Sequence, residues 1–224
     1  MATVEVMRQK FHDDLDGLVL RLGELVAVVG QAMRRATVAL LDANGELADS
    51  VVVDDVEIAA RQHDVDELAL GILARQQPVA TDLRTVVACL RMSVDLRRMG
   101  KLAVHIAEIT RRRLPGATVP TGLVAVVLAM ADVAERLVGA AGRAVVTRDG
   151  AAAAELEHQD DEVDLLQEQL YGLLFTQPQV LDTENIADIA LIGRYYERFA
   201  DHAVSLARDV AYLAGTRPLD AAAR

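Results

Sequence analysis

The chain has few cysteines, few aromatic residues and no long apolar run, which argues against a disulfide-bonded, sheet-rich or membrane-spanning protein. Cys89 is the sole cysteine, so no disulfide can form within the chain. Aromatic residues make up 3% of the sequence and tryptophan is absent, while 52% of the residues are hydrophobic. A core of leucine, valine, isoleucine, alanine and methionine favours closely packed helices over a β-sandwich. The most apolar run, residues 123–131, is far shorter than the ~20 residues needed to cross a bilayer.

Positive charge is also scarce. The chain has 23 Lys and Arg against 34 Asp and Glu, a formal net charge of −11. Nucleic-acid binders gather cations on one face, so this balance argues against nucleic acid as a partner. Residues 1–113 hold 15 cations against 17 acids, whereas residues 114–224 hold 8 against 17. No apolar leader segment follows Met1, and we expect a soluble cytoplasmic protein.

Helical periodicity fills the chain between a few breaks that contain glycine or proline. The breaks are Asn44-Gly45, Gln77-Pro78, Pro115-Gly116, Asp149-Gly150 and Gln177-Pro178. Between them lie about six segments of about 25 to 35 residues whose apolar side chains recur every three or four positions. The valines at 51–53 look strand-like, but their surroundings have a helical period, so we assign them to a helix. Six long helices with short turns predict an all-α fold of two tandem antiparallel three-helix bundles, residues 1–114 and 115–224.

The two halves of the chain repeat each other at an offset of 100 residues. Residues 54–110 align with 154–210 without a gap, and 11 of the 57 positions are identical. Gln77-Pro78 falls on Gln177-Pro178, so the same break precedes the last helix of each half. Each repeat is therefore expected to supply three helices.

Charge is reversed at one place in this alignment. Arg97 and Lys101 of the first repeat occupy the positions of Glu197 and Asp201 in the second. Residues four apart share a helix face, so the members of each pair project together. The two carboxylates repel each other, and a divalent or trivalent cation beside them would relieve that repulsion.

Asp160 and Asp164 form a second acidic pair, on the helix before Glu197 and Asp201. Counted from the turn at residues 177–178, Asp160 and Glu197 differ by about 3 Å in height, so one ion can bridge them. Asp164 and Asp201 differ by about 15 Å, so the four cannot share a single ion. We take all four as candidate metal ligands, for one ion or for several along a groove. The alternative is that they are solvated surface acids without a metal.

The third helix of each repeat resembles a known signature. Residues 95–108 (DLRRMGKLAVHIAE) and 196–204 (YERFADHAV) are similar to the ERIGD-x-A motif of the PhoU family of phosphate-uptake regulators. The resemblance covers nearly the whole chain and implies two three-helix bundles and a cytoplasmic regulator that is not an enzyme. It implies action with a phosphate ABC transporter ATPase and a sensor histidine kinase, holding the phosphate-starvation response off. It also implies multinuclear metal clusters held by Glu/Asp-x-x-x-Asp/Asn motifs.

Departures from that motif confine the expected metal to the second repeat, where iron, zinc, manganese and magnesium all remain open. In the first repeat, the four aligned positions hold Ala60, Asp64, Arg97 and Lys101. Three of these four residues have no carboxylate to bind a metal. We expect Arg97 or Lys101 to supply positive charge there, with Lys101 neutralising Asp64 or Glu57.

Other interpretations remain open. Glu155-x-x-His158 has the spacing of di-iron bundles, but we find no second copy, which disfavours a ferritin-like oxidase. A metal-storage or redox bundle predicts bound iron, and a plain dimeric scaffold predicts no metal. The arginines at 111–113 complement the dipole at the end of their helix, and they are a candidate contact for an acidic partner or a membrane surface. We expect a homodimer that meets the membrane only through its partners.

Three aromatic residues and one histidine fall in the signature helix of the second repeat. Tyr195, Tyr196 and Phe199 cluster there, and we expect them to pack in the core or at an interface. We expect His202, which follows Asp201, to be a partly buried histidine rather than a ligand.

Overall fold

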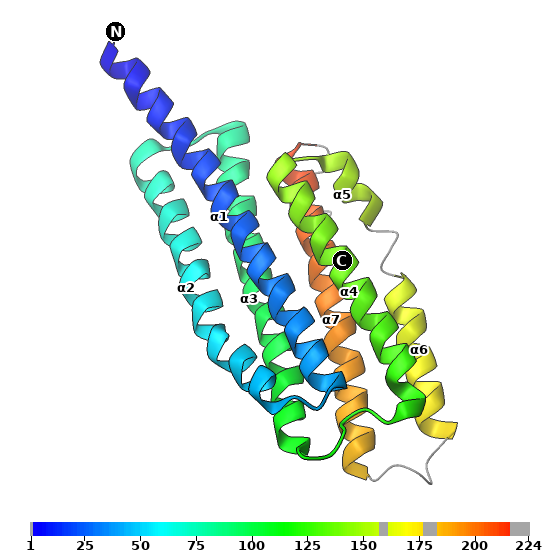
Figure 1. Cartoon of the computed structure of the whole chain (residues 1–224). Helices are drawn as coiled ribbons and strands as arrows, with labels where there is room; N and C mark the ends of the chain where they lie inside the picture. The colour runs from blue at the N-terminus through cyan, green and yellow to red at the C-terminus, as the bar shows by residue number, and fades with distance from the viewer. Residues whose placement is uncertain (1, 157–160, 177–182, 216–224) are drawn as a thin grey trace.

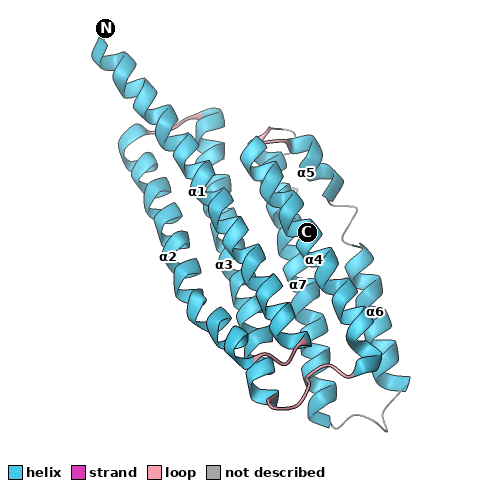
Figure 2. Ribbon diagram, viewed as in Figure 1, coloured by secondary structure: helices cyan, strands magenta, loops and turns pink. Residues whose placement is uncertain are grey.

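The computed structural model of the protein is all helical (Figure 2), and it describes residues 2–156, 161–176 and 183–215. The elements are α1 (Ala2–Leu41), α2 (Gly45–Gln76), α3 (Ala80–Arg113), the 3-10 helix η1 (Thr121–Leu123), α4 (Val124–Thr147), α5 (Gly150–Leu156), α6 (Asp161–Thr176) and α7 (Thr183–Leu213). The described residues contain no strand, and the valines at 51–53 lie within α2. The predicted fold class is confirmed. None of the described helices is long and apolar enough to cross a membrane.

The helices form two three-helix bundles that lie side by side (Figure 1). One bundle contains α1, α2 and α3, and the other contains α4, α7 and the pair α5 and α6. The pair stands where one long helix was predicted, and residues 157–160 lie outside the described residues. Corresponding helices of the two bundles run in opposite directions, since α1 descends in Figure 1 while α4 rises. The domain division at residues 114 and 115 stays a prediction, although it coincides with the connection between α3 and η1.

Local chemistry explains where the helices begin and end. The side chain of Asn44 accepts a hydrogen bond of 3.0 Å from the backbone N–H of Leu47, which caps the start of α2. Gln77 ends α2 in the left-handed conformation with φ 48°, and Pro78 cannot extend the helix. Arg148 ends α4 in the same left-handed region, with φ 54°. The predicted breaks at these positions are confirmed.

One hydrophobic core runs through both bundles. Tyr196 and Phe199 of α7 are among its largest fully buried side chains, which confirms their predicted packing role. The hydroxyl groups of Tyr196 and Thr37 are 2.7 Å apart, so a helix of each bundle contributes to this buried hydrogen bond. The bundles meet along two seams, α1 against α4 and α3 against α7.

The α1–α4 seam brings two helix backbones close together. A Cβ atom on Gly23 would lie 2.7 Å from Val146 Cγ2, and one on Gly142 would lie 2.8 Å from Val26 Cγ1. A larger residue at either position would force the helices apart, so glycine permits this approach. A mostly apolar groove of about 690 Å³ follows the outside of the seam.

The α3–α7 seam is crossed by polar pairs instead. Arg113 in the last turn of α3 donates a hydrogen bond of 2.5 Å from Nε to Asp188 near the start of α7. Farther along, Nδ1 of His202 lies 3.1 Å from Oδ1 of Asp95. Such pairs have one favourable register, so they align the two signature helices as well as hold them together.

Candidate functional site

Glu197 is a buried carboxylate in the middle of α7, with 8% of its surface exposed. Arg194, one turn earlier, donates a hydrogen bond to its Oε1. Its Oε2 is buried and has no hydrogen-bond partner among the described residues. Burial raises the pKa of Glu197, Asp201 raises it further, and Asp164 adds to this against the opposing charge of Arg194. This carboxylate is therefore short of positive charge.

Asp164 and Asp201 are exposed carboxylates on either side of Glu197. A Cβ atom on Gly193 of α7 would lie 2.6 Å from the side chain of Leu170 of α6, so these two residues are at about the same height. Counting along the helices from that contact, Asp164 lies about 9 Å away, between Glu197 at about 6 Å and Asp201 at about 12 Å. The three carboxylates are thus within about one helical turn of one another in height, so the predicted difference of about 15 Å between Asp164 and Asp201 was wrong.

Only part of the predicted ligand set can be placed. Asp160 lies outside the described residues, so its pairing with Glu197 stays a prediction. Within the described ranges, no three His, Cys, Asp or Glu side chains are close enough to hold a metal ion. The donors nevertheless suit a cation, because Oε2 of Glu197 is buried without a partner and Asp164 and Asp201 act on the same group. Carboxylate oxygens are the ligands that hard ions such as Mg²⁺ and Mn²⁺ prefer.

In the first repeat, the aligned positions hold a compact ion-pair cluster. Arg97 of α3 donates two hydrogen bonds to Asp55 of α2, from Nη1 to Oδ1 at 2.5 Å and from Nη2 to Oδ2 at 3.0 Å. Lys101 donates a third, from Nζ to Oδ2 of Asp55 at 2.5 Å. The hydrogen bond from Arg97 outweighs burial and, with that from Lys101, holds the pKa of Asp55 below its usual range. We call Asp55, Arg97 and Lys101 the Asp55 cluster.

The predicted partner of Lys101, Asp64 or Glu57, was wrong, because Lys101 binds Asp55. Asp55 precedes Ile58 by three residues, so the two share a face of α2. That face packs on α3, because Ile58 Cγ2 would lie 3.0 Å from a Cβ atom on Gly100. Glu57 and Asp64 are rotated from this face by roughly 100° or more, so they are not the nearest carboxylates to α3.

Asp209 is a second buried carboxylate on α7, and sequence reasoning missed it. It is 1% exposed, and Nη2 of Arg91 lies 3.2 Å from its Oδ1, although neither carboxylate oxygen has a hydrogen bond among the described residues. Burial raises the pKa of Asp209 to about 6 despite the attraction of Arg91, and the charge of Asp95 contributes. It borders a hollow of about 430 Å³ on the outside of the α3–α7 seam. No local pattern marks this residue, because the helix that buries it belongs to the other repeat.

The two histidines of the signature helices both meet residues of the other repeat. His202 is buried, as predicted, against Asp95 of α3. Burial alone would raise the pKa of Asp95, but hydrogen bonds from His202 and Ser205 hold it below its usual range. His105 of α3 lies against Tyr195 of α7, with ring centroids 5.4 Å apart. Both contacts join positions that sequence reasoning could not pair.

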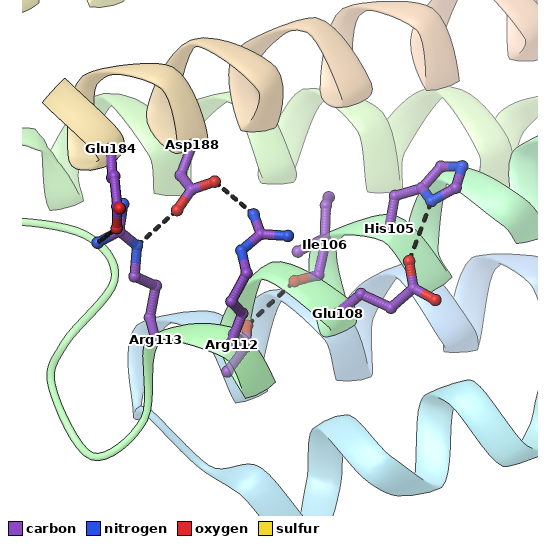
Figure 3. Close-up of polar contacts among 8 residues, drawn as sticks. His105, Ile106, Glu108, Arg112, Arg113, Glu184 and Asp188 are labelled. Atoms are coloured by element: carbon purple, nitrogen blue, oxygen red, sulfur yellow. Dashed lines mark hydrogen bonds and ion pairs between the residues drawn. The ribbon is translucent and has the colours of Figure 1, made fainter.

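The arginines that end α3 bind carboxylates within the molecule. Nε of Arg111 lies 2.6 Å from Oδ1 of Asp49 in α2. Arg112 and Arg113 both reach Asp188 of α7, each with a nitrogen–oxygen distance of 2.5 Å (Figure 3). Their contact with an acidic partner or a membrane surface stays a prediction, and these carboxylates would compete with such a partner.

Known proteins are similar to this chain in sequence and in fold. The family described as "PhoU domain" matches residues 22–110 and 127–210, one segment in each bundle. The chain belongs to the PhoU family. A Mycobacterium tuberculosis relative, "Phosphate-specific transport system accessory protein PhoU homolog 2", is 40% identical over 208 residues, covering 93% of this chain and 98% of its own. "PhoU homolog 1" of Mycobacterium leprae is 40% identical over 215 residues, covering 96% and 97%.

Solved PhoU structures have the same architecture. PhoU from Pseudomonas aeruginosa matches with a TM-score of 0.82 at 27% identity, covering 93% of this chain and 99% of that one. The phosphate transport system regulatory protein PhoU from Streptococcus pneumoniae matches with a TM-score of 0.84 at 21% identity, covering 92% and 98%, a likeness of fold alone. The PhoU resemblance predicted from the signature helices is confirmed.

Proposed function

We propose that this PhoU-family protein regulates phosphate-specific transport and the response to phosphate starvation, and that it is not an enzyme. The observation that carries the proposal is 40% identity, over nearly the whole of both chains, to proteins named as accessory to phosphate-specific transport. Similarity of this extent includes both bundles and both signature helices. The similarity extends beyond a single shared domain. The whole protein is therefore expected to have the accessory role in phosphate-specific transport that the names of those relatives state.

In its finer form, the proposed function is that of a cytoplasmic adaptor. The protein links the ATPase of a phosphate ABC transporter to a sensor histidine kinase, and it acts as a homodimer. Large exposed apolar side chains on the outer helices support a binding role. Val53 and Val56 of α2 are 68% and 74% exposed, and Phe175 of α6 is 78% exposed. Apolar side chains left in water at such positions are available to a partner.

A metal ion at the second repeat belongs to the same proposal. Glu197, Asp164 and Asp201 are its proposed ligands within the described residues, and Asp160 is a proposed fourth ligand that lies outside them. The buried, unpartnered Oε2 of Glu197 supports the assignment. The ion would supply the positive charge that this carboxylate lacks, hold α6 against α7 and so set the surface that α6 offers to a partner. Iron, zinc, manganese and magnesium remain the candidates.

A cell assay and a binding assay together test the regulatory role. Cells that lack the protein are expected to transcribe their phosphate-transporter genes even in high phosphate, and the restored chain is expected to switch transcription off. The purified protein is expected to bind the transporter ATPase or the cytoplasmic part of the kinase in calorimetry. A protein that leaves transcription unchanged and binds neither partner, in high or low phosphate, would overturn the proposal.

A further inference from the structure

The two repeats place opposite charges at corresponding positions of their third helices. Arg97 and Lys101 on α3 correspond to Glu197 and Asp201 on α7. In the first repeat both side chains reach the middle helix of their own bundle. Glu197 and Asp201 lie within about one helical turn in height of Asp164 on α6, the middle helix of their bundle, as the contact of Gly193 with Leu170 indicates. Corresponding positions of the third helix therefore carry cations in one half and carboxylates in the other.

The Asp55 cluster already contains what a metal ion would supply. Both oxygens of Asp55 accept hydrogen bonds from cations, and the side chain is 14% exposed. The guanidinium of Arg97 binds in the bidentate manner that suits a carboxylate, and Lys101 adds a point charge. Two positive charges face one negative charge, so the cluster has no deficit for an ion to fill. An approaching metal cation would be repelled.

In the described part of the second repeat, no pair of cationic side chains binds both oxygens of the buried carboxylate of Glu197. Arg194 reaches one oxygen of Glu197, and the other is buried without a hydrogen-bond partner in the described part of the chain. The residues at the two positions where the first repeat has cations are both acidic. At these corresponding positions, the charge deficit is thus confined to the second repeat.

We infer that this chain responds to metal ions through its second repeat alone, because the Asp55 cluster takes the place of an ion in the first. Metal sites in both repeats do not fit the residues present. The side chains of Arg97 and Lys101 hold α2 against α3 through Asp55. The surface formed by α2 and α3 is therefore the same at every metal concentration. The surface formed by α6 and α7 changes when metal binds. This part of the inference rests on the second-repeat metal site proposed above.

Hydrogen exchange measured helix by helix tests this asymmetry with Mn²⁺ and Zn²⁺ as probes. Adding either ion to metal-free protein is expected to slow exchange in α6 and α7 and to leave α2 and the facing part of α3 unchanged. EDTA is expected to reverse the effect. The double variant Glu197→Gln with Asp201→Asn is expected to lose the bound metal, counted by mass spectrometry of the elements, while circular dichroism shows its helices intact.

A gain-of-site variant provides the opposite test. Arg97→Glu with Lys101→Asp gives α3 the acidic pair of α7, opposite Asp55, and is expected to raise the metal content above that of the wild type and to make exchange in α2 and α3 metal-dependent. Arg97→Gln with Lys101→Gln removes the cations without adding ligands, and is expected to leave the metal content unchanged. Arg98→Glu changes charge one residue away from the cluster and is expected to do the same.

Each result is decisive. Metal-dependent protection of α2 and α3 in the wild type, or full metal content in the Glu197→Gln and Asp201→Asn variant, would show that the first repeat binds metal and would overturn the inference. No metal binding by wild-type protein would overturn both the second-repeat site and the asymmetry. The regulatory role would survive that result, because transcription and partner binding test it separately.

Discussion

Single carboxylates in this protein have different ionisation behaviour because their surroundings differ. Asp55 receives hydrogen bonds from two cations, and its pKa falls. Glu197 is hydrogen-bonded at one oxygen and lies near other acids, and its pKa rises. Asp209 is almost fully buried beside one guanidinium, and its pKa rises to about 6. The balance of hydrogen bonds and nearby cations against burial and neighbouring acids therefore decides the direction of the pKa shift.

Asp209→Asn is expected to stabilise the protein above about pH 6. The pKa of Asp209 rises from its usual 3.8 to about 6 on folding, so the folded state holds this proton more tightly than the unfolded state. Stability from the group is complete below the unfolded pKa and is lost as pH rises through the folded one. The neutral amide escapes that loss, which amounts to roughly 1–3 kcal/mol. Urea denaturation at pH values on both sides of this window measures it.

The advantage of Asp209→Asn is expected to vanish below about pH 3, where Asp209 is protonated in both the folded and the unfolded wild type. Asp132→Asn, at an exposed position of α4, is the matched control and is expected to show no comparable dependence. A variant less stable than wild type at pH 8 would mean that the pair with Arg91 is worth more than the cost of burying the charge.

Sequence reasoning found the charge reversal at Arg97 and Glu197 because an alignment compares residue types. The partner Asp55 was out of its reach, since that depends on how α2 is rotated against α3. Burial of Asp209 was also hidden, because α3 of the other repeat covers it. Side-chain type is visible in a sequence, whereas rotation and burial are properties of packed helices.

Among the helices, the two seams between the bundles differ in the contacts they use. Close approach at the α1–α4 seam depends on glycine, while ion pairs and hydrogen bonds cross the α3–α7 seam. A glycine seam tolerates little change in volume, because interiors are close-packed. A polar seam tolerates little change in register, because hydrogen bonds are directional.

Gly142→Ala is expected to destabilise the protein although alanine favours helices. Its Cβ atom would lie 2.8 Å from Cγ1 of Val26, so α1 and α4 must shift. Overpacking of this kind costs about 1–3 kcal/mol, against a gain of roughly 1 kcal/mol in helix propensity. Gly17→Ala is the control, because nothing lies within 4 Å of its new methyl group, and it is expected to stabilise. Thermal unfolding of both variants measures the difference, and equal stabilisation would contradict a tight seam.

Helix boundaries were the most predictable elements, because their signals are local. Asn44 and Pro78 act on their own neighbours, so the ends of α2 followed from the sequence. The contact between Arg113 and Asp188 joins residues 75 positions apart, and no local pattern announces it. The relative heights of the acidic residues on α6 and α7 along the bundle could not be predicted either, because they follow from the long-range contact between Leu170 and Gly193.

At the level of the whole molecule, one core spans both bundles, although the chain is duplicated. Residues of each half bury residues of the other, as the hydrogen bond between Thr37 of α1 and Tyr196 of α7 illustrates. Two bundles joined in this way are expected to unfold as one cooperative unit.

The single cysteine provides a probe of that cooperativity. Cys89 of α3 is fully buried, and burial raises the pKa of its thiol to about 12, so it reacts with thiol reagents only when the first bundle opens. The urea midpoint for Cys89 labelling is expected to coincide with the midpoint for loss of helical circular dichroism, which reports both bundles. Two separate midpoints would show that the bundles unfold independently.

The opposite chain directions of the two bundles resemble the arrangement of a homodimer about a twofold axis. Two identical single-repeat polypeptides would carry every residue in duplicate, so a cation in one subunit would be a cation in the other. One continuous polypeptide removes that restriction. Its halves can keep the same shape while mutations alter one copy of a site and spare the other. The connection after α3 therefore allows two bundles of the same shape to carry different charges at corresponding positions.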